Sequence, residues 1–342
     1  MEKVTIQDVA REAGVSLGTA SNALNHPEKL KASTLQKVQS AMSTLGYMPN
    51  QSARLLAGGR NASFGLLLPS LDHGLFLQIA NGAHSEARRH GFGLLIASAD
   101  DDEQLQRSYL RYFMGTQMAG VLIQPLRIHD APLDADFPIP IVYLDLHCRQ
   151  PGYFVAVDNR AQGRLIAEHA VSIGSRRVSV IGSCEGPQAE HRVRGIRDVE
   201  ATNPSVDFDY LLEGSTGLAR DGFMMAQRIA ELPETERPDF IIALSDVLAT
   251  GAIAGAQDAG LRVPDDIAIA GCDGNPLAWN DSVPLTTCAP TGYEMGRRGV
   301  QFLVEQIGDG AGRERNPPVE EDPCHQTLIR PFLLARRSTV RG

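Results

Sequence analysis

Residues 4–25 read VTIQDVAREAGVSLGTASNALN, and this stretch decides how the chain begins to fold. Thr5 and Asp8 stand three residues apart, a spacing that predicts a capped helix start, and apolar residues then recur at helical spacing. Gly14 can adopt the left-handed conformation that ends such a helix, and Ser16 can cap a second helix that begins directly after it. The stretch therefore predicts two short helices joined by a tight turn.

Two helices joined so tightly through a glycine are typical of a helix-turn-helix, whose second helix lies in the major groove of DNA. We expect a third helix to follow, with Ser33 and Gln36 as its capping box and Gly46 at its end. A plain three-helix bundle that binds no nucleic acid is the alternative. Short polar side chains on the second helix favour DNA binding, because such groups suit phosphates and base edges: Ser16, Thr19, Ser21, Asn22 and Asn25.

The segment that follows Tyr47 is too short to be a stable helix by itself. It reads MPNQSARLLAGGR, with Asn50 as a possible cap and Gly58 and Gly59 as a break. Only about seven residues are left to be helical, fewer than the roughly 12 to 15 at which an isolated helix becomes marginal. We expect this segment to fold only when another element holds it.

The composition is that of a globular protein with more than one domain. The chain has 342 residues, of which 43% are hydrophobic and 21% are charged, and this length suggests two or three domains. It contains neither a secretion signal nor an apolar run of the roughly 18 to 20 residues that span a membrane, so we expect a cytoplasmic protein that binds no membrane. Five widely spaced cysteines, never arranged as CxxC, predict no zinc site and no disulfide framework, and we expect no metal or cofactor.

Charge is distributed unevenly along the chain. Residues 1–60 carry a net charge of +3, and the remainder carries −12. A small basic head on an acidic body suits a protein that binds a polyanion at one end, because repulsion keeps the body away from phosphates.

From residue 64 onward, short apolar runs alternate with helical stretches. One set of apolar runs covers 64–69, 92–98, 120–124 and 139–144, and a second set covers 178–181, 210–212, 240–244 and 267–272. This alternation predicts parallel sheets with helices on both faces, and the two sets predict two lobes. Ligands bind beyond the carboxyl ends of parallel strands, so a cleft between two facing lobes is the expected binding site.

The chain resembles one family over almost its whole length. The resemblance is carried by VTIQDVAREAGVS at the start, by the LN pair at positions 24 and 25, and by LGYMPNQSARLLAG across 45–58. These motifs are similar to those of the lactose-repressor/galactose-repressor family of bacterial transcriptional regulators. The resemblance implies an α/β two-lobed, periplasmic-binding-protein-like core made of two doubly wound parallel sheets, with an all-α N-terminal helix-turn-helix head.

The same resemblance implies the domain boundaries. Residues 1–49 would form the DNA-binding head, 50–60 a hinge helix and linker, and 61–342 the effector-binding and dimerisation domain. Within that domain the N-lobe would comprise about 61–157 plus 289–322, and the C-lobe about 158–288 plus 323–338. The stretches 155–159, 284–290 and 326–331 would cross between the lobes, and a helix over about 291–307 would return to the N-lobe.

Family resemblance also indicates which residues contact DNA. Leu17, Gly18 and Asn22 occupy the positions that read bases in the major groove. All three depart from many members, since Leu17 is apolar, Gly18 has no side chain, and Asn22 replaces the arginine or histidine often found there. Leu56 would enter the minor groove as a wedge when two hinge helices meet on an operator. The full predicted DNA-binding set is Thr5, Ser16, Leu17, Gly18, Thr19, Ser21, Asn22, Asn25, Tyr47, Asn50, Ala53 and Leu56.

A second set of residues is implied to bind a small-molecule effector. Arg192 and Asp273 are its centre, because a guanidinium and a carboxylate can together hold a hydroxyl-bearing or anionic ligand. Simpler interpretations exist: Arg192 could belong to a solvated face with Arg194 and Arg197, and Asp145 could cap a turn. The other members of the set are Leu75, Phe76, Gln124, Asp145, Gln188 and Ser245.

The expected function is that of a sequence-specific transcriptional regulator, most simply a repressor. Its partners would be palindromic double-stranded operator DNA, a second copy of the chain, and a sugar, sugar phosphate or nucleoside-like effector. No GxGxxG follows the first strand, and no GxxxxGK[ST] or GxSxG occurs, so we do not expect an enzyme. The alternative is a two-lobed small-molecule-binding receptor without a gene-regulatory role.

Overall fold

The computed structural model describes most of the chain, and the predicted hinge positions Asn50, Ala53 and Leu56 lie outside the part that it describes. By its internal contacts the chain divides into two compact units, an N-terminal unit that runs to Ala62 with Gly115–Ala119, and a second unit that contains the remainder. The described residues are 4–47, 61–71, 74–126, 138–147, 151–184, 186–212, 218–275, 283–289, 292–309 and 324–340.

The N-terminal head consists of three α-helices and one short 3-10 turn. The elements are α1 (Ile6–Ala13), α2 (Leu17–Asn25), η1 (Pro27–Lys29) and α3 (Ala32–Leu45). Thr5 forms the predicted capping box with Asp8, Gly14 ends α1 in the left-handed conformation, and the Ser16 hydroxyl caps α2. The predicted helix pair and its turn are therefore confirmed.

The predicted capping box of the third helix is wrong. Helix α3 begins at Ala32, its N-cap position is Lys31, and no side chain caps it. Ser33 consequently lies inside the first turn, where its hydroxyl is past the position that caps the free amides. The predicted end of the helix at Gly46 is confirmed, since Gly46 adopts a left-handed conformation there.

Small apolar side chains form the core of the head. Val9, Val38 and Ala41 are buried at its centre, and Ala20 of α2 is buried as well. Alanine at these positions lets the three helices approach closely while the outer surface of α2 stays available.

The first lobe is built on a six-stranded parallel sheet in the order β11-β5-β4-β3-β1-β2. Its helices are α5 (Gly74–Arg89), α6 (Glu103–Gly115) and α11 (Gly292–Asp309), and α11 packs against α5. The strands are β1 (Ser63–Leu68), β2 (Gly93–Ser98), β3 (Gly120–Ile123), β4 (Ile141–Leu144), β5 (Gly152–Val157) and β11 (Cys324–Ile329).

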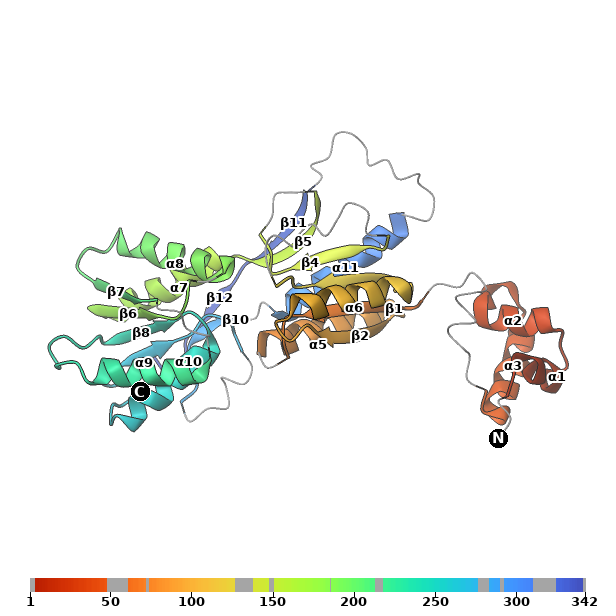
Figure 1. Cartoon of the computed structure of the whole chain (residues 1–342), viewed down its shortest axis with the longest axis horizontal. Coiled ribbons are helices and arrows are strands. Elements are labelled where there is room, and N and C mark those ends of the chain that lie inside the picture. Colours follow the sequence, from red (N-terminus) through yellow and green to blue (C-terminus); the bar gives the residue numbers. More distant parts are fainter. Residues whose placement is uncertain are drawn as a thin grey trace. The chain divides into compact units, whose positions relative to one another are not determined.

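The second lobe contains a four-stranded parallel sheet in the order β7-β6-β8-β9. The sheet lies between α7 and α8 on one face and α9 and α10 on the other, and each face has its own buried core (Figure 1). The strands are β6 (Arg177–Ile181), β7 (Asp207–Leu211), β8 (Phe240–Ala243) and β9 (Ala268–Ala270). The helices are α7 (Asn159–Ser172), α8 (Pro187–Glu200), α9 (Ala219–Ala230) and α10 (Asp246–Asp258).

A small antiparallel pair, β10 (Thr287–Ala289) with β12 (Phe332–Leu334), adjoins the second lobe, and an isolated bridge links Ala270 to Thr286. Among the described residues, no helix is both long enough and apolar enough to cross a membrane.

One predicted lobe boundary is wrong by a strand. The predicted C-lobe includes residues 323–338, but β11 pairs in parallel with β5, with Thr327 opposite Val155, and so belongs to the sheet of the first lobe. The chain therefore leaves the first lobe for the last time only after Ile329, and β12 is its final return to the second lobe.

Helices α9 and α10 touch through their backbones. A Cβ atom on Gly222 would lie 2.0 Å from the carbonyl oxygen of Leu248, and one on Gly251 would lie 1.8 Å from that of Ala219. Any side chain at either position would push the two helices apart, so the close packing of this helix pair requires glycine.

Candidate functional site

The surface of α2 presents the predicted base-reading residues. Leu17 is 47% exposed, Gly18 is exposed, and the Asn22 side chain forms no hydrogen bond with any residue that the structure describes. An exposed leucine and an uncommitted amide on one short helix are suited to a thymine methyl group and a base edge. These three residues remain the candidates for base readout.

Other predicted DNA-binding residues form hydrogen bonds or packing contacts within the head. The Ser16 hydroxyl accepts from the Thr19 amide at 3.1 Å and lies 2.9 Å from the Thr19 hydroxyl, so both side chains serve the helix cap. Thr5 is engaged with Asp8, and Tyr47 packs partly buried against the head core. Ser21 is partly buried on α2, and the side chain of Asn25 lies outside the described part of the chain.

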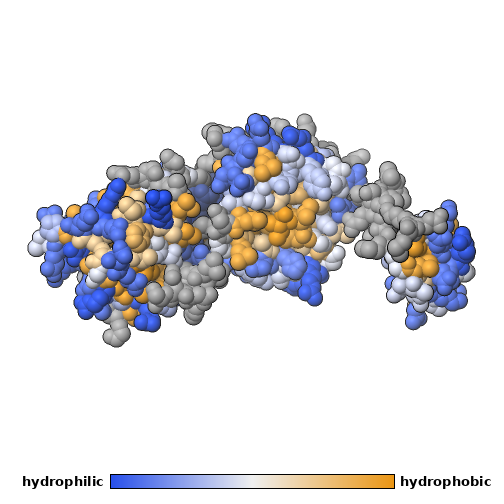
Figure 2. All heavy atoms as spheres, turned by 60° about the horizontal axis from the view of Figure 1, so that its bottom comes forward, coloured by the Kyte–Doolittle hydropathy of each residue, from blue (hydrophilic) through white to orange (hydrophobic). Residues whose placement is uncertain are grey.

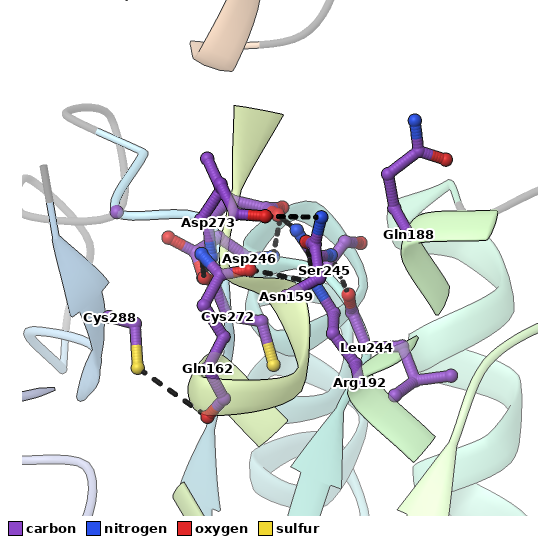
Figure 3. A network of polar contacts seen from close by, with 12 residues as sticks. Asn159, Gln162, Gln188, Arg192, Leu244, Ser245, Asp246, Cys272, Asp273 and Cys288 are labelled. Atoms are coloured by element: carbon purple, nitrogen blue, oxygen red, sulfur yellow. Dashed lines mark hydrogen bonds and ion pairs between the residues drawn. The ribbon is translucent and has the colours of Figure 1, made fainter. Parts of the chain in front are cut away.

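Arg192 of α8 lies at the centre of a buried polar cluster in the second lobe (Figure 3). Its Nη2 forms an ion pair with Asp273 Oδ1 at 2.8 Å, and its Nη1 donates to the carbonyl oxygen of Leu244 at 2.5 Å. Its Nε faces the amide oxygens of Asn159 and Gln162 at 3.2 and 3.1 Å. The interpretation of Arg192 as part of a solvated face is therefore wrong.

Close packing of α7 and α8 explains how this arrangement forms. A Cβ atom on Gly163 would lie 2.0 Å from the carbonyl oxygen of Arg192, so the backbones of the two helices touch at this point. The contact brings Asn159 and Gln162 of α7 within reach of the guanidinium, and Gln162 also donates to the carbonyl oxygen of Cys272 at 2.8 Å.

Asp246 is the principal residue that the sequence interpretation missed. It is fully buried, and its carboxylate accepts from the amides of Asp273 and Asn275 at 2.9 and 2.7 Å and from the Thr287 hydroxyl at 2.7 Å. The Asp246 amide in turn donates to Asp273 Oδ2 at 3.0 Å. The first turn of α10 and the loop after β9 are thus joined by a reciprocal pair of hydrogen bonds.

The first lobe contributes Asp145, which follows β4 and has a positive φ of 54°. Gln188 of α8 donates to the Asp145 carbonyl oxygen at 2.8 Å, so this bond joins the two lobes. A second bond between the lobes runs from the Gln78 side chain to the carbonyl oxygen of Gly274. We use the name interlobe cluster for Asp145, Gln188, Arg192, Asp246 and Asp273.

The remaining predicted effector residues have varied surroundings. Gln124 is buried after β3, and its Oε1 has no hydrogen-bond partner in the described part of the chain, as a ligand-binding group would. Ser245 caps α10 through a bond from the Leu248 amide at 3.2 Å, which gives it a structural role. Leu75 is buried in the first turn of α5, and Phe76 beside it is partly buried.

Burial changes the acidity of the cluster. It raises the pKa of Asp145 to about 6, against the opposing charge of Arg192. Burial and the neighbouring charge of Asp273 raise the pKa of Asp246 to about 7, although the three donors to Asp246 favour its ionised form. Both carboxyls therefore hold a proton at a higher pH than in an unfolded chain.

These shifts predict a pH-dependent stability. Between about pH 4 and pH 7 the native state binds more protons than the unfolded state, so the free energy of unfolding falls as pH rises through this window. The lowered pKa values of His147 and His169 act in the opposite direction, so the wild type must be compared with a variant. In urea titrations, the free energy of unfolding of Asp145→Asn should fall less between pH 5 and 7.5 than that of the wild type. Asp265→Asn should match the wild type. If the free energy of unfolding changes equally with pH in all three proteins, Asp145 does not have the raised pKa.

A compact helix-turn-helix head, together with a two-lobed α/β body whose lobes meet at a buried polar cluster, defines a class of ligand-responsive DNA-binding proteins. Comparison with known proteins agrees with this definition. Residues 5–50 match the family model of bacterial regulatory proteins of the lacI family, and residues 167–339 match the periplasmic binding protein-like domain.

Individual proteins show the same relationship. The ribose operon repressor of Bacillus subtilis (strain 168) is 30% identical over 339 residues, which cover 98% of each chain. The transcriptional repressor PurR of Aliivibrio fischeri (strain MJ11) is 28% identical over 311 residues, which cover 89% of this chain and 92% of PurR. A lac repressor dimer bound to operator and an anti-inducer shares the fold, with a TM-score of 0.81, 24% identity, and coverage of 99% of this chain and 100% of that one.

The chain therefore belongs to the lacI family of bacterial regulatory proteins. It is a DNA-binding transcriptional regulator, and the relatives named above are regulators rather than enzymes.

Proposed function

We propose that the protein is a homodimeric repressor, active in the bacterial cytoplasm, that binds a palindromic operator and is controlled by a small molecule in the interlobe cluster. The observation that carries this proposal is the buried cluster itself, to which both lobes contribute on a chain that also bears a DNA-binding head. A ligand that favours one arrangement of the lobes would alter DNA binding by a coupling free energy of about 1 to 3 kcal/mol.

The charges of the cluster favour a neutral effector. Arg192 is in contact with Asp273, and its positive charge also acts on Asp145 and Asp246. A phosphate group would add negative charge beside these three buried carboxyls, which share the single positive charge of Arg192. Hydroxyl groups can both donate to carboxylates and accept from amides, so a sugar-like polyol suits the site better than a sugar phosphate.

The dimer contact is proposed to lie on the first lobe. Figure 2 shows apolar residues gathered on one face of this lobe, in the centre of the view. The exposed apolar residues of this lobe include Leu77 of α5 and Leu95 and Ile96 of the adjacent strand β2, which are 52%, 41% and 42% exposed. Strand β2 is also an edge strand, whose apolar side chains need a cover. A second copy of the chain provides that cover.

The dimer proposal predicts the effect of a charge in this patch. Ile96→Lys should convert the dimer to a monomer in sedimentation velocity, because a lysine ammonium would have to be desolvated at the contact. Met224 of α9 is similarly exposed at 46%, and Met224→Lys should leave the dimer intact. If both variants sediment as the wild type does, the contact lies elsewhere.

The DNA-binding proposal predicts a loss of selectivity at one base pair. Asn22→Ala should reduce discrimination at one position of each half-site by about 1 to 3 kcal/mol, because the lost amide no longer pairs with a base edge. Gln39→Ala removes an exposed amide from α3 and should change nothing. Selection from a random DNA pool with each variant gives the preference at every position. An equal loss of affinity for all sequences would rule out base reading by Asn22.

The proposed function as a whole is tested by DNA binding with and without ligand. The pool selected by the wild type should be palindromic, its binding should weaken as salt rises, and neutral sugars should change operator affinity while sugar phosphates should not. Ligand binding without any selective DNA binding would instead support a receptor that regulates no gene.

A further inference from the structure

A cavity lies in the second lobe, apart from the interlobe cluster. Its volume is about 280 Å³, close to the lower end of the size range of small-molecule sites, roughly 300 to 1,000 Å³. It is lined by residues of β6 and β7, by α9 and by the chain between α9 and β8. No residue of the interlobe cluster lines this cavity, so the two sites share no residue.

The strand residues at this cavity face α9. Ile181 belongs to the core under α9 and α10, so side chains at alternate positions of β6, Ser179 and Arg177, lie on the same face. Their partners across the sheet, Asp209 and Asp207, share that face because paired residues of adjacent strands lie on the same side.

Three polar side chains at the cavity have no partner among the residues that the structure describes. Ser179 is 2% exposed, and its hydroxyl has no hydrogen-bond partner in the described structure, which is costly for a buried group. Arg177 and Asp207 are direct cross-strand partners, yet neither side chain forms an ion pair or hydrogen bond with any described residue. The cavity therefore offers a hydroxyl, a cation and an anion from neighbouring positions of the paired strands β6 and β7.

The rest of the lining is mixed, with the charged Asp209, Arg228 and Glu236 beside a group of apolar residues. The apolar residues are Met225 and Ile229 of α9, Leu232 just after that helix, Leu211 and Pro238. We propose that this cavity is a second small-molecule site, for a molecule with an aliphatic body and a zwitterionic head, the chemistry of an aliphatic α-amino acid. The carboxylate would bind Arg177 and the Ser179 hydroxyl, the ammonium would bind Asp207, and the side chain would lie against α9.

The site is connected to the interlobe cluster through two helices. Helix α9 covers the cavity and is fixed to α10 by the backbone contacts at Gly222 and Gly251. Helix α10 begins with Asp246, which carries the hydrogen bonds to the loop after β9. A ligand that displaces α9 therefore acts on the interlobe cluster. This regulatory consequence rests on the proposed function, whereas binding at the cavity does not.

Isothermal titration of the full chain with L-leucine tests the site. L-leucine should bind, and each of three analogues should bind at least about tenfold more weakly: 4-methylpentanoate without the ammonium, 3-methylbutylamine without the carboxylate, and L-serine without the aliphatic body. Arg177→Gln should also weaken L-leucine binding about tenfold, while Arg176→Gln, one residue earlier and outside the cavity lining, should not.

Ser179→Ala should affect thermal stability and L-leucine binding in different directions. Removing an unpartnered buried hydroxyl should leave thermal stability unchanged or raise it, yet it should weaken L-leucine binding. The proposal is overturned if L-leucine shows no binding at any concentration from about 10-fold molar excess up to its solubility limit. It is also overturned if 4-methylpentanoate binds as tightly as L-leucine, or if Arg176→Gln weakens L-leucine binding as much as Arg177→Gln does. None of these outcomes depends on operator binding, so the site and the proposed function fail separately.

Discussion

Arg192→Met is expected to abolish the response to the effector and to lower the free energy of unfolding by about 3 to 5 kcal/mol. Methionine keeps much of the side-chain volume but removes the charge that is paired with Asp273 at 2.8 Å. Asp273 would then be a buried carboxylate without its cation, and the amide oxygens of Asn159 and Gln162 would lose a donor. Urea unfolding measures the first effect, and operator affinity with and without the effector measures the second.

Arg194 provides the matched control. It is two residues away on the same helix, its side chain is 56% exposed, and it pairs with the equally exposed Glu190. Exposed pairs contribute about 0 to 1 kcal/mol, so Arg194→Met should leave both stability and effector response close to the wild type. If the two variants behave alike, the buried ion pair has no special role and the location of the effector site is wrong.

Gly251→Ala is expected to destabilise the second lobe by about 2 to 3 kcal/mol, near the upper end for overpacking. The added methyl group would lie 1.8 Å from the Ala219 carbonyl oxygen and 2.6 Å from its carbon, and backbone cannot rotate away as a side chain can. Helices α9 and α10 would have to separate. Thermal unfolding followed by circular dichroism would show a lowered transition temperature.

Gly308→Ala distinguishes this effect from that of a helical glycine in general. Gly308 lies in α11 with no atom within 4 Å of an added Cβ, so alanine there should raise stability by about 0.5 to 1 kcal/mol through its higher helix propensity. A loss of stability at Gly308, or a gain at Gly251, would contradict the packing argument.

Local signals in the sequence were sufficient for most elements of the fold. Capping at Thr5 and Ser16 and termination at Gly14 depend on a few neighbouring residues, so the pattern predicted them correctly. Ser33 misled the prediction because the chain enters α3 from the preceding 3-10 turn, two residues earlier than the capping pattern suggests. The placement of β11 depends on pairing with β5, about 170 residues away, and no local pattern contains that information.

The candidate site was predicted in part, and its main omission has a physical explanation. Arg192 and Asp273 were chosen because the chain resembles a known family, and the structure brings them together. Asp246 looked like an ordinary acidic residue in the first turn of a helix, where it would favour the helix dipole. Its role arises only because the Gly271 backbone passes so close that a Cβ there would lie 2.2 Å from Asp246 Oδ1.

The late return of the chain to the first lobe has a consequence during synthesis on the ribosome. Strands β3 and β4 are complete by Leu144, but α11, which packs against them, ends only at Asp309. At about 5 to 20 residues per second, the apolar surface of these strands waits roughly 10 to 30 s for its cover. Over that interval the nascent polypeptide exposes an incomplete sheet with apolar side chains, a surface of the kind that ribosome-associated chaperones bind.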